Sequence, residues 1–482
     1  MNLIDHLRIQ ARVQPTAIAA IDATGTWSRE ALWSRVQRIA ELLQHLDVRR
    51  VASRLDNSVE AVAVDLALRL IGAVHLPLPP FFTEAQVQHA QSMVGADVCI
   101  SPRREARAID LGAGLYLHPL QVPEAMPVMP SATALVTFTS GSTGAPKGVC
   151  LAAEHLDAVA MAVVDALVGQ IPQRHLSLMP LAVLLEQVAG VYAALYVGAP
   201  IVLPGLAETG LIGAAQLDAG RLCACIDRHR PQSLILVPQM LQAWVAALAQ
   251  GGSAPDSLRF CAVGGARVSG RLLDAAAGLP VFQGYGLSEC GSVVSLNRPG
   301  ANCPGSVGQA LRHVRLEVDA DGEILIGGSQ FLGYVGEQGE RPPIYRSGDL
   351  GHVDEQGYVW LDGRRRNVFI TAFGRNVSPE WVESELMQHP DIAQAVVDGE
   401  AREFNSAVVV PRRPDLSEVA LDLAIAEVNR GLPDYARVSR YLRADEPFLP
   451  GNQQLTGNGR VRRDVVLARY AAALEVFHTQ TQ

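Results

Sequence analysis

Short apolar runs alternate with helical patterns along most of this chain, and this alternation restricts the folds open to it. Ser28 is a candidate N-cap, after which apolar residues recur at the spacing of one helix face, at Leu32, Val36, Ile39 and Leu43. Short apolar runs bounded by Gly or Pro follow at residues 134–138, 201–203, 234–237 and 260–263. Such runs between helices are typical of buried strands, so the pattern predicts an α/β architecture.

The pattern of apolar and polar residues changes after residue 308 and again after residue 363. Val314–Val318 alternates in polarity, Asp321-Gly322 is a turn signal, and a β-rich subdomain is therefore expected there. Beyond a polar run at 363–367, Ser378-Pro379 predicts a helix start, and residues 393–397 and 407–410 are strand-like. We predict a large N-terminal α/β domain of residues 1–363 that includes this subdomain, followed by a small α+β C-terminal domain of residues 364–482.

Composition and charge exclude several classes of protein. The 482 residues are 49% hydrophobic and 18% charged, as in ordinary globular proteins, and the net charge of −9 argues against a nucleic-acid partner. The first residues lack a signal-peptide pattern, and the longest apolar stretches, such as residues 189–203, are too short for stable membrane insertion. We expect a cytoplasmic protein. The seven cysteines are scattered, and no pair of them has the spacing of a zinc site, so we expect free thiols.

One basic residue stands apart from the others. Of the 40 Lys and Arg residues, Lys147 is the only lysine. Arginine is a rigid planar fork and lysine a compact point charge, so a chain that keeps a single lysine indicates a site that needs the point charge. Lys147 ends a loop rich in glycine and hydroxyl groups, residues 139–148, which suits an anion. A Walker A loop is excluded, because Gly148 stands where the Mg²⁺-binding Ser or Thr should be.

This loop and several later motifs resemble, in order, the motifs of the adenylate-forming superfamily, which includes acyl-CoA synthetases, peptide-synthetase adenylation domains and luciferases. The matching segments are residues 139–148, Tyr285-Gly286-Leu287-Ser288-Glu289, residues 322–328, Tyr345-Arg346-Ser347-Gly348-Asp349-Leu350, Gly363-Arg364 and residues 374–380. Ser378–Glu383 and Met179–Glu186 lean towards its long-chain acyl-CoA synthetase branch. The resemblance implies that the C-terminal domain is a mobile lid.

The resemblance also implies a reaction. A carboxylic acid would attack ATP with Mg²⁺ present, giving an acyl-adenylate and pyrophosphate, and the acyl group would then pass to a thiol. Because both reactants of the first step are anionic, catalysis requires mainly charge neutralisation and positioning. The thiol would belong to CoA or to the phosphopantetheine of a carrier protein, which we expect to act in trans. The substrate would be a small carboxylic acid, fatty or otherwise apolar.

Residue roles follow from the matched motifs. The β- and γ-phosphates would be held by Lys147 and by Thr139, Ser140, Gly141, Ser142, Thr143 and Gly144. Ser288 would touch the α-phosphate, and Glu289 would ligate Mg²⁺, a hard cation that prefers oxygen. The adenine would lie between Tyr285, with its neighbours Gly284 and Gly286, and the segment Gly264, Gly265 and Ala266. Asp349 and Arg364 would bind the ribose, Arg366 would be the hinge, and the loop at Gly374 would line the thiol tunnel.

Two positions depart from the family pattern. Arg460 stands where the family has a lysine that bridges the substrate carboxylate and the α-phosphate. Either arginine is a tolerated cation there, or adenylation is weakened. Val183 replaces a histidine of the Pro-Leu-Ala-His motif, which with Leu184 predicts an apolar acyl pocket.

Two other functions remain open at this stage. A degenerate member would bind nucleotide or acyl ligand with weak or no adenylation, and Arg460 would be its mark. Alternatively, the adenylate would be used for ring closure or amide formation, which would give products without any thiol.

Lys147 gives the first testable prediction. In Lys147→Ala we expect acid-dependent pyrophosphate release to fall on the order of 100-fold, because a charge that stabilises the departing phosphates is lost. A pyrophosphate-release assay with saturating acid measures the effect. Release at the wild-type rate would contradict the role given to this lysine.

Overall fold

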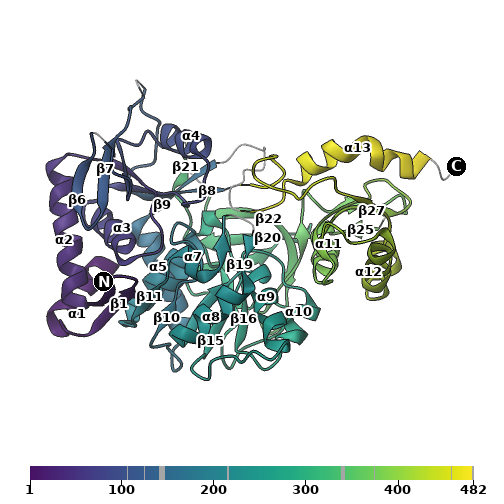
Figure 1. The fold of residues 1–482 in the computed structure, drawn as a ribbon, viewed down its shortest axis with the longest axis horizontal. Coiled ribbons are helices and arrows are strands. Elements are labelled where there is room, and N and C mark those ends of the chain that lie inside the picture. Colours follow the sequence, from purple (N-terminus) through teal and green to yellow (C-terminus); the bar gives the residue numbers. More distant parts are fainter. Residues whose placement is uncertain are drawn as a thin grey trace.

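The computed structural model describes residues 1–105, 107–123, 125–139, 147–213, 216–337, 342–373, 375–456 and 459–479, and every structural statement below concerns these residues. Two large sheets and their helices form the N-terminal part, and a smaller unit follows it at the right of Figure 1. The predicted α/β class is confirmed.

The first large sheet has nine strands within the described residues. In spatial order they are β18 (Gln309–Ala310), β17 (Ser295–Leu296), β16 (Val281–Tyr285), β15 (Phe260–Val263), β14 (Ser233–Leu236), β10 (His175–Leu176), β11 (Ile201–Leu203), β1 (Ile18–Asp22) and β2 (Gly25–Ser28). Pairing is parallel from β16 across to β1 and antiparallel at both edges. The carboxyl ends of β14, β15 and β16 therefore meet at one edge of the sheet.

The second large sheet has eight strands in the described part of the chain. They are β21 (Gly333–Tyr334), β9 (Lys147–Ala152), β8 (Thr133–Thr139), β4 (Val74–Pro77), β3 (Arg50–Ser53), β5 (Val98–Ser101), β7 (Leu115–Pro119) and β6 (Ile109–Gly112). Thr139 at the end of β8 pairs with Lys147 at the start of β9, so the predicted loop joins two antiparallel strands. Residues 140–146 lie outside the described residues.

Helices cover these sheets. They are α1 (Leu3–Val13), α2 (Arg29–His45), α3 (Val59–Ile71), α4 (Glu84–Val94), α5 (Ala153–Ala166), the π-helix η1 (Glu186–Tyr192), α6 (Ala193–Val197), α7 (Leu206–Thr209), α8 (Ala219–His229), α9 (Pro238–Ala249), α10 (Gly270–Ala275) and the 3₁₀ turn η2 (Ser288–Cys290). Ser28 caps α2 as predicted, because its side chain accepts from the amide of Ala31. Leu32, Val36, Ile39 and Leu43 are all buried on the inner face of that helix. A short hairpin, β12 (Leu211–Ile212) with β13 (Gln216–Leu217), precedes α8.

A buried polar network ties the layers of the N-terminal part together. The Asp65 carboxylate on α3 accepts from His75 Nδ1 at 2.7 Å, from Gln187 Nε2 at 2.9 Å and from the Tyr192 hydroxyl at 2.5 Å. Burial alone would raise the pKa of Asp65, but the hydrogen bond and charge of His75 hold it below its ordinary value. The ionised carboxylate is thus the form that the folded chain favours.

The predicted β-rich subdomain is a separate four-stranded antiparallel sheet. Its strands are β19 (Val314–Val318), β20 (Glu323–Gly328), β22 (Ile344–Val353) and β23 (Val359–Arg364). Asp321-Gly322 makes the turn of the first hairpin, as predicted, with Gly322 at a positive φ of 81°. Arg364 is the last residue of β23 and pairs with Asp349 of β22.

The C-terminal part has its own core. Its elements are β24 (Phe369–Ile370), β25 (Asn376–Val377), α11 (Pro379–Met387), β26 (Ile392–Asp398), β27 (Asn405–Pro411), α12 (Glu418–Arg430), the turn η3 (Asp434–Ala436), β28 (Val438–Arg443) and α13 (Arg463–Thr479). Both predicted strands are present, as β26 and β27. Ser378 precedes α11 but does not cap it, because its hydroxyl bonds to Glu380 Oε2 at 3.3 Å instead.

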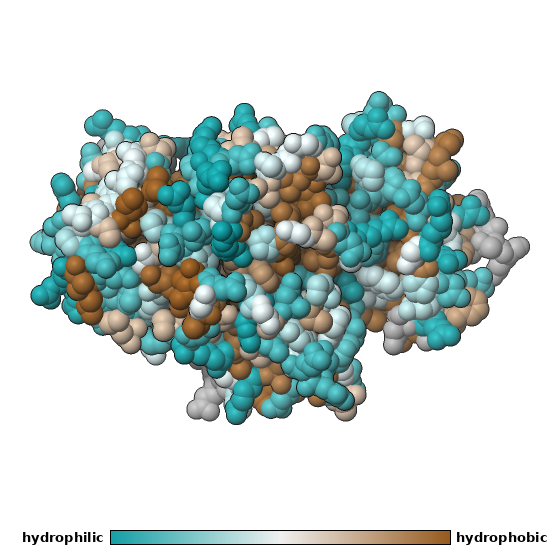
Figure 2. Space-filling view, turned by 90° about the horizontal axis from the view of Figure 1, so that it is seen from below, coloured by the Kyte–Doolittle hydropathy of each residue, from teal (hydrophilic) through white to brown (hydrophobic). Residues whose placement is uncertain are grey.

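The lengths of the helices and the hydropathy of the surface bear on membrane insertion. No helix in the described ranges is long and apolar enough to cross a bilayer. Most of the face seen in Figure 2 is hydrophilic, with hydrophobic side chains gathered in several separate patches. The seven cysteines are present as thiols rather than in disulfides, which agrees with the expectation.

Candidate active site

The candidate site lies at the carboxyl ends of the parallel strands, where open α/β sheets bind their ligands. Gly264 directly follows β15, and Tyr285 ends the neighbouring strand β16. A Cβ atom at Gly264 would lie 3.2 Å from the Gly284 carbonyl oxygen, so glycine permits the close approach of the two segments. Gly265 has a φ of +83°, which side chains rarely adopt, and it is exposed together with Ala266. Gly265 and Ala266 are thus accessible just beyond the end of β15, while Gly264 itself is buried.

Asp349 joins three motifs that are distant in sequence. Its Oδ2 accepts from the Tyr285 hydroxyl at 2.6 Å, and its Oδ1 pairs with Arg364 Nε at 2.7 Å. The backbone amide of Asp349 donates to Ser347 Oγ, whose own hydroxyl donates to the carbonyl of Ile324. The carboxylate is thus held in position by the subdomain sheet and by β16.

The electrostatics of Asp349 and Tyr285 follow from burial. Desolvation raises the pKa of Asp349 above its ordinary value, although the charge of Arg364 and the Tyr285 hydrogen bond act in the opposite direction. Desolvation also raises the pKa of Tyr285, and the neighbouring Asp349 charge raises it further. Tyr285 is therefore a neutral hydrogen-bond donor, and Asp349 is a carboxylate whose charge is costly to keep out of water.

Tyr334 contacts both Lys147 and Glu289. The Lys147 Nζ lies 4.6 Å from the centre of the Tyr334 ring and 3.6 Å from Glu337 Oε1. The Tyr334 hydroxyl donates to Glu289 Oε1 at 2.9 Å. Strand β21 carries Tyr334 alongside β9, which begins with Lys147, so the pairing of these strands builds the arrangement. One ammonium group and one buried carboxylate thereby lie on either side of Tyr334.

Glu289 and Ser288 depend on a tight turn. A Cβ atom at Gly286 would lie 1.5 Å from the carbonyl oxygen of Ser292, so only glycine fits between Tyr285 and the 3₁₀ turn that begins at Ser288. The carbonyl of Glu289 accepts from the amide of Phe331 at 2.8 Å. Ser288 is half-buried and Glu289 is buried. A buried carboxylate at this position is a suitable ligand for a hard divalent cation.

The C-terminal part contributes Arg460 to the same region. Arg460 is exposed, yet enough protein surrounds its guanidinium that desolvation lowers its pKa, as does the charge of Arg364. Glu289 and Asp349 act in the opposite direction, which places Arg460 within electrostatic reach of both carboxylates. The amide of Thr456 donates to the Arg460 carbonyl at 2.7 Å, and the amide of Arg460 donates to Thr456 Oγ1 at 3.0 Å, so two hydrogen bonds fix the backbone of Arg460. Arg460 thus adds a positive charge near both acidic groups of the N-terminal part.

The segment predicted to form the acyl pocket is held from two sides. Asn57 donates to the Met179 carbonyl and accepts from the Leu181 amide, both at 2.9 Å. Glu186, fully buried at the start of the π-helix, pairs with His175 Nε2 at 2.8 Å. A π-helix is uncommon and occurs frequently at functional sites.

The two residues predicted to line that pocket differ in their burial. Val183 is half-buried on the loop before the π-helix. Leu184 is buried in the large N-terminal core, because the helical turn that starts there points it inward. Leu185 is instead the leucine that approaches Gly264, with its Cδ2 3.8 Å from a Cβ built there.

The run of three arginines at the domain junction is not uniform. Arg364 pairs with Asp349, as described above. Arg365 pairs with Glu323 and Asp321 at 2.8 Å each. The β20 hairpin supplies both carboxylates, which the local sequence does not reveal. Arg366, the expected hinge, is exposed.

The fold brings most of the predicted residues into one region. Ser140, Gly141, Ser142, Thr143, Gly144 and Gly374 lie outside the described residues. Sequence reasoning missed Tyr334, Asn57 and Glu186. Tyr334 stands in an aromatic pair with Phe331 after Gly327-Gly328, and Glu186 is a lone acid in an apolar segment. These two features of the sequence could have drawn attention to Tyr334 and Glu186.

Comparison with known proteins identifies the class. Residues 7–335 match the AMP-binding enzyme family, and residues 366–482 match the AMP-binding enzyme C-terminal domain. The chain belongs to this family, and its structural neighbours are ligases of the adenylate-forming superfamily. The predicted family is confirmed.

Several similar curated relatives carry the names of CoA ligases or CoA synthases. An indoleacetate–CoA ligase of Aromatoleum aromaticum is 29% identical over 75% of this chain and 71% of its own length. A feruloyl-CoA synthase of an Amycolatopsis species is 30% identical over 96% of this chain and 97% of its own. A long-chain-fatty-acid–CoA ligase of Mycobacterium bovis is 30% identical, but over only 46% of this chain and 42% of its own length.

A solved structure confirms the fold over the whole chain. The anthranilate CoA ligase AuaEII in complex with anthranoyl-AMP superposes with a TM-score of 0.80 at 20% identity, covering 98% of each chain. At this identity the likeness establishes the large α/β part and the separate C-terminal part.

The opposite pKa shifts of two buried aspartates generate a stability prediction. At pH 7 we expect Asp349→Asn to leave the melting temperature unchanged or higher, because it removes a charge that burial disfavours. As the pH falls through the raised pKa of Asp349, the wild type becomes protonated and the difference between the two proteins shrinks. Thermal melts from pH 7 to pH 4 measure both effects.

Asp65→Asn is the matched control. Its carboxylate has a lowered pKa, so the stability it contributes is present at pH 7 and is lost as the pH falls through that lowered pKa. We expect Asp65→Asn to cost about 1–3 kcal/mol at pH 7. A large loss of stability in Asp349→Asn with none in Asp65→Asn would contradict this account.

Proposed function

We propose that this protein is an AMP-forming ligase that activates a carboxylic acid with an apolar, preferably aromatic, body and transfers it to a thiol. The observation that carries the proposal is the cluster around Glu289 and Asp349. Arg364 pairs with Asp349, Lys147 lies on the Tyr334 ring whose hydroxyl binds Glu289, and Arg460 interacts electrostatically with both carboxylates. Membership of the family and the CoA ligases among its relatives support it.

The nucleotide would bind beside Tyr285 and the Gly264–Ala266 segment. Asp349 and Arg364, fixed by their mutual ion pair, would bind the ribose hydroxyls. The adenine would lie between Tyr285 and the Gly264–Ala266 segment, where Gly264 carries no side chain to block it. Thr139 and Lys147, opposed across β8 and β9, would hold the outer phosphates with the loop between them.

A magnesium ion fits the chemistry of Glu289. A buried carboxylate is an oxygen ligand of the kind this ion prefers, and Tyr334 orients it by donating to one of its two oxygens. When bound, the ion would neutralise charge on the phosphates. Lys147 would contribute a further positive charge from the other side of Tyr334.

The reaction would proceed by displacement at the α-phosphate. An oxygen of the substrate carboxylate would form a bond to that phosphorus, and the bond to the β-phosphate oxygen would break to release pyrophosphate. Arg460 would lower the repulsion between carboxylate and phosphate. In a second step the thiol sulfur would attack the acyl carbon and release AMP. A lid rotation at Arg366 would precede this step and would bring the Gly374 loop to the site.

The acid would lie against Val183 and Leu185. Both side chains are apolar, and Leu185 borders Gly264. A relative that spans nearly the whole chain carries the name of a feruloyl-CoA synthase, and the fatty-acid ligase from Mycobacterium bovis matches less than half of this chain. We therefore rank aromatic acids above long-chain fatty acids, and CoA above a carrier protein as the acceptor.

A panel of acids tests the proposal. We expect pyrophosphate release with aryl acids such as indoleacetate, ferulate and anthranilate to exceed release with palmitate, and a CoA thioester to accumulate when CoA is present. Product analysis by mass spectrometry identifies the thioester. ATP binding without pyrophosphate release from any acid would favour a degenerate member that binds its ligands without adenylation. Amide or cyclised products formed without a thiol would favour an enzyme that uses the adenylate for amide formation or ring closure.

The variant Arg460→Lys tests whether arginine at this position, in place of the family's lysine, weakens adenylation. Because arginine and lysine both place a positive charge near Glu289 and Asp349, we expect the variant to change the rate of acid-dependent pyrophosphate exchange by less than about 5-fold. Arg460→Ala should lose about 100-fold, since it removes the charge itself. A large gain in Arg460→Lys would instead show that arginine impairs the first half-reaction.

A further inference from the structure

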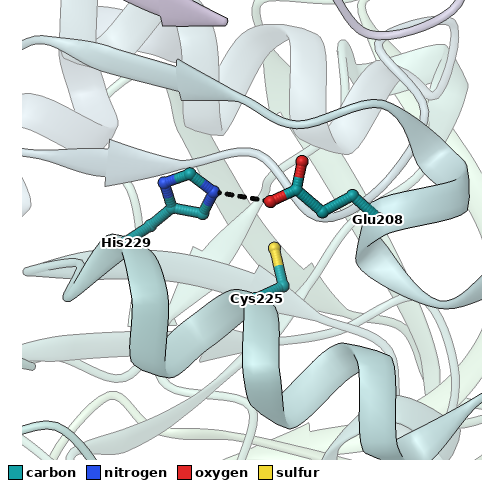
Figure 3. A group of neighbouring side chains, drawn as sticks. All are labelled: Glu208, Cys225 and His229. Carbon is teal, nitrogen blue, oxygen red and sulfur yellow. Dashed lines mark hydrogen bonds and ion pairs between the residues drawn. The ribbon is translucent and has the colours of Figure 1, made fainter. Parts of the chain in front are cut away.

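Three side chains with metal-binding atoms converge away from the candidate active site. Glu208 lies on α7, and Cys225 and His229 lie on α8. Their carboxylate, thiol and imidazole atoms all lie within 4.8 Å of one another, and Figure 3 shows the three groups pointing toward a common point. Cys225 is 1% exposed, while Glu208 and His229 are half-buried. The group is therefore reachable from solvent on the Glu208–His229 side.

The helix geometry explains this convergence. Cys225 and His229 are four residues apart on α8, so they occupy the same face one turn apart. The short helix α7 is held over that face at Gly210, where the amide of Asp218 donates to the Gly210 carbonyl at 2.8 Å. A Cβ atom at Gly210 would lie 2.4 Å from the Asp218 carbonyl oxygen, so glycine permits the contact. The placement of Glu208 is thus built into the fold.

We propose that Glu208, Cys225 and His229 form a binding site for a zinc ion. Thiolate sulfur, imidazole nitrogen and carboxylate oxygen are the three donor types that zinc takes in proteins. His229 Nε2 and Glu208 Oε1 are 3.0 Å apart, a separation compatible with two ligands on one ion, and the ion would replace their hydrogen bond. A small movement of the Cys225 side chain completes the set, and water takes the fourth position.

The charges around the group suit a divalent ion. Thiolate and carboxylate together carry two negative charges, which balance the charge of zinc. Arg228 pairs with Glu208 Oε1 at 2.8 Å, and its side chain is 66% exposed. A neighbour of this kind orients a metal-binding carboxylate from outside the coordination shell. Magnesium, which prefers oxygen ligands throughout, does not fit a site with a sulfur donor.

The closest cysteine on the same helix offers a matched control. Cys223 is two residues before Cys225 and therefore lies on a different face of α8, and it is half-buried. Replacing Cys223 changes the same kind of side chain on the same helix without touching the proposed ligands.

Cobalt titration of the untagged full-length chain tests the proposal. Co²⁺ substitutes for zinc and gives a charge-transfer absorption when it binds a thiolate. We expect one equivalent of Co²⁺ to produce this absorption, and one equivalent of Zn²⁺ to abolish it. The same band should persist in Cys223→Ala and be lost in Cys225→Ala, and His229→Ala and Glu208→Gln should each weaken Co²⁺ binding at least ~10-fold.

Thermal stability provides a second measurement that does not depend on the Co²⁺ absorption band. Saturating Zn²⁺ should raise the melting temperature of the wild type and of Cys223→Ala by roughly 2–4 °C, and should leave that of Cys225→Ala and His229→Ala unchanged. Circular dichroism confirms that each variant is folded. The proposal is overturned if the folded wild type gives no thiolate band, or if Cys225→Ala and His229→Ala respond to metal as the wild type does.

Discussion

Asp349 is a carboxylate that the fold takes out of water and keeps between a phenol and a guanidinium. Tyr285 reaches it from the end of β16 and Arg364 from the end of β23, so a single side chain connects the large parallel sheet and the β-rich subdomain. Its pKa is raised by burial, which means that the folded chain carries the charge at a cost. Such a cost is commonly found where a group is kept ready for a ligand rather than for stability.

The same principle extends across the site. Lys147, Glu289 and Arg460 come from the β8–β9 connection, the turn after β16 and the C-terminal part, and each has a neighbour of opposite charge or an aromatic face. Charges arranged in advance lose little energy in reorganisation when an anionic ligand arrives. In the proposed reaction, two anions must meet at one phosphorus, and the positive charges of Lys147 and Arg460 would reduce the repulsion between them.

Local patterns in the sequence predicted much of this architecture. Apolar runs marked β8, β11, β14 and β15 to within a residue or two, and the Ser28 cap and the Asp321-Gly322 turn were both predicted, because each of these features depends on a few adjacent residues. What the sequence did not reveal depends on distant contacts. The partners of Arg365, the inward turn of Leu184 and the π-helix that begins at Glu186 are set by packing between elements far apart in the chain. The group of Glu208, Cys225 and His229 is of this kind, since the cysteine spacing alone gave no indication of it.

The position of Lys147 over the Tyr334 ring has a practical consequence. Since every other basic side chain is an arginine or a histidine, the chain carries one side-chain ammonium group, and that group lies against Tyr334 in the candidate site. A sample labelled isotopically at lysine would give a single lysine side-chain resonance, free of overlap, whose shift reports the ring current of Tyr334. The arrival and departure of a nucleotide could then be followed at one atom, without any engineered probe.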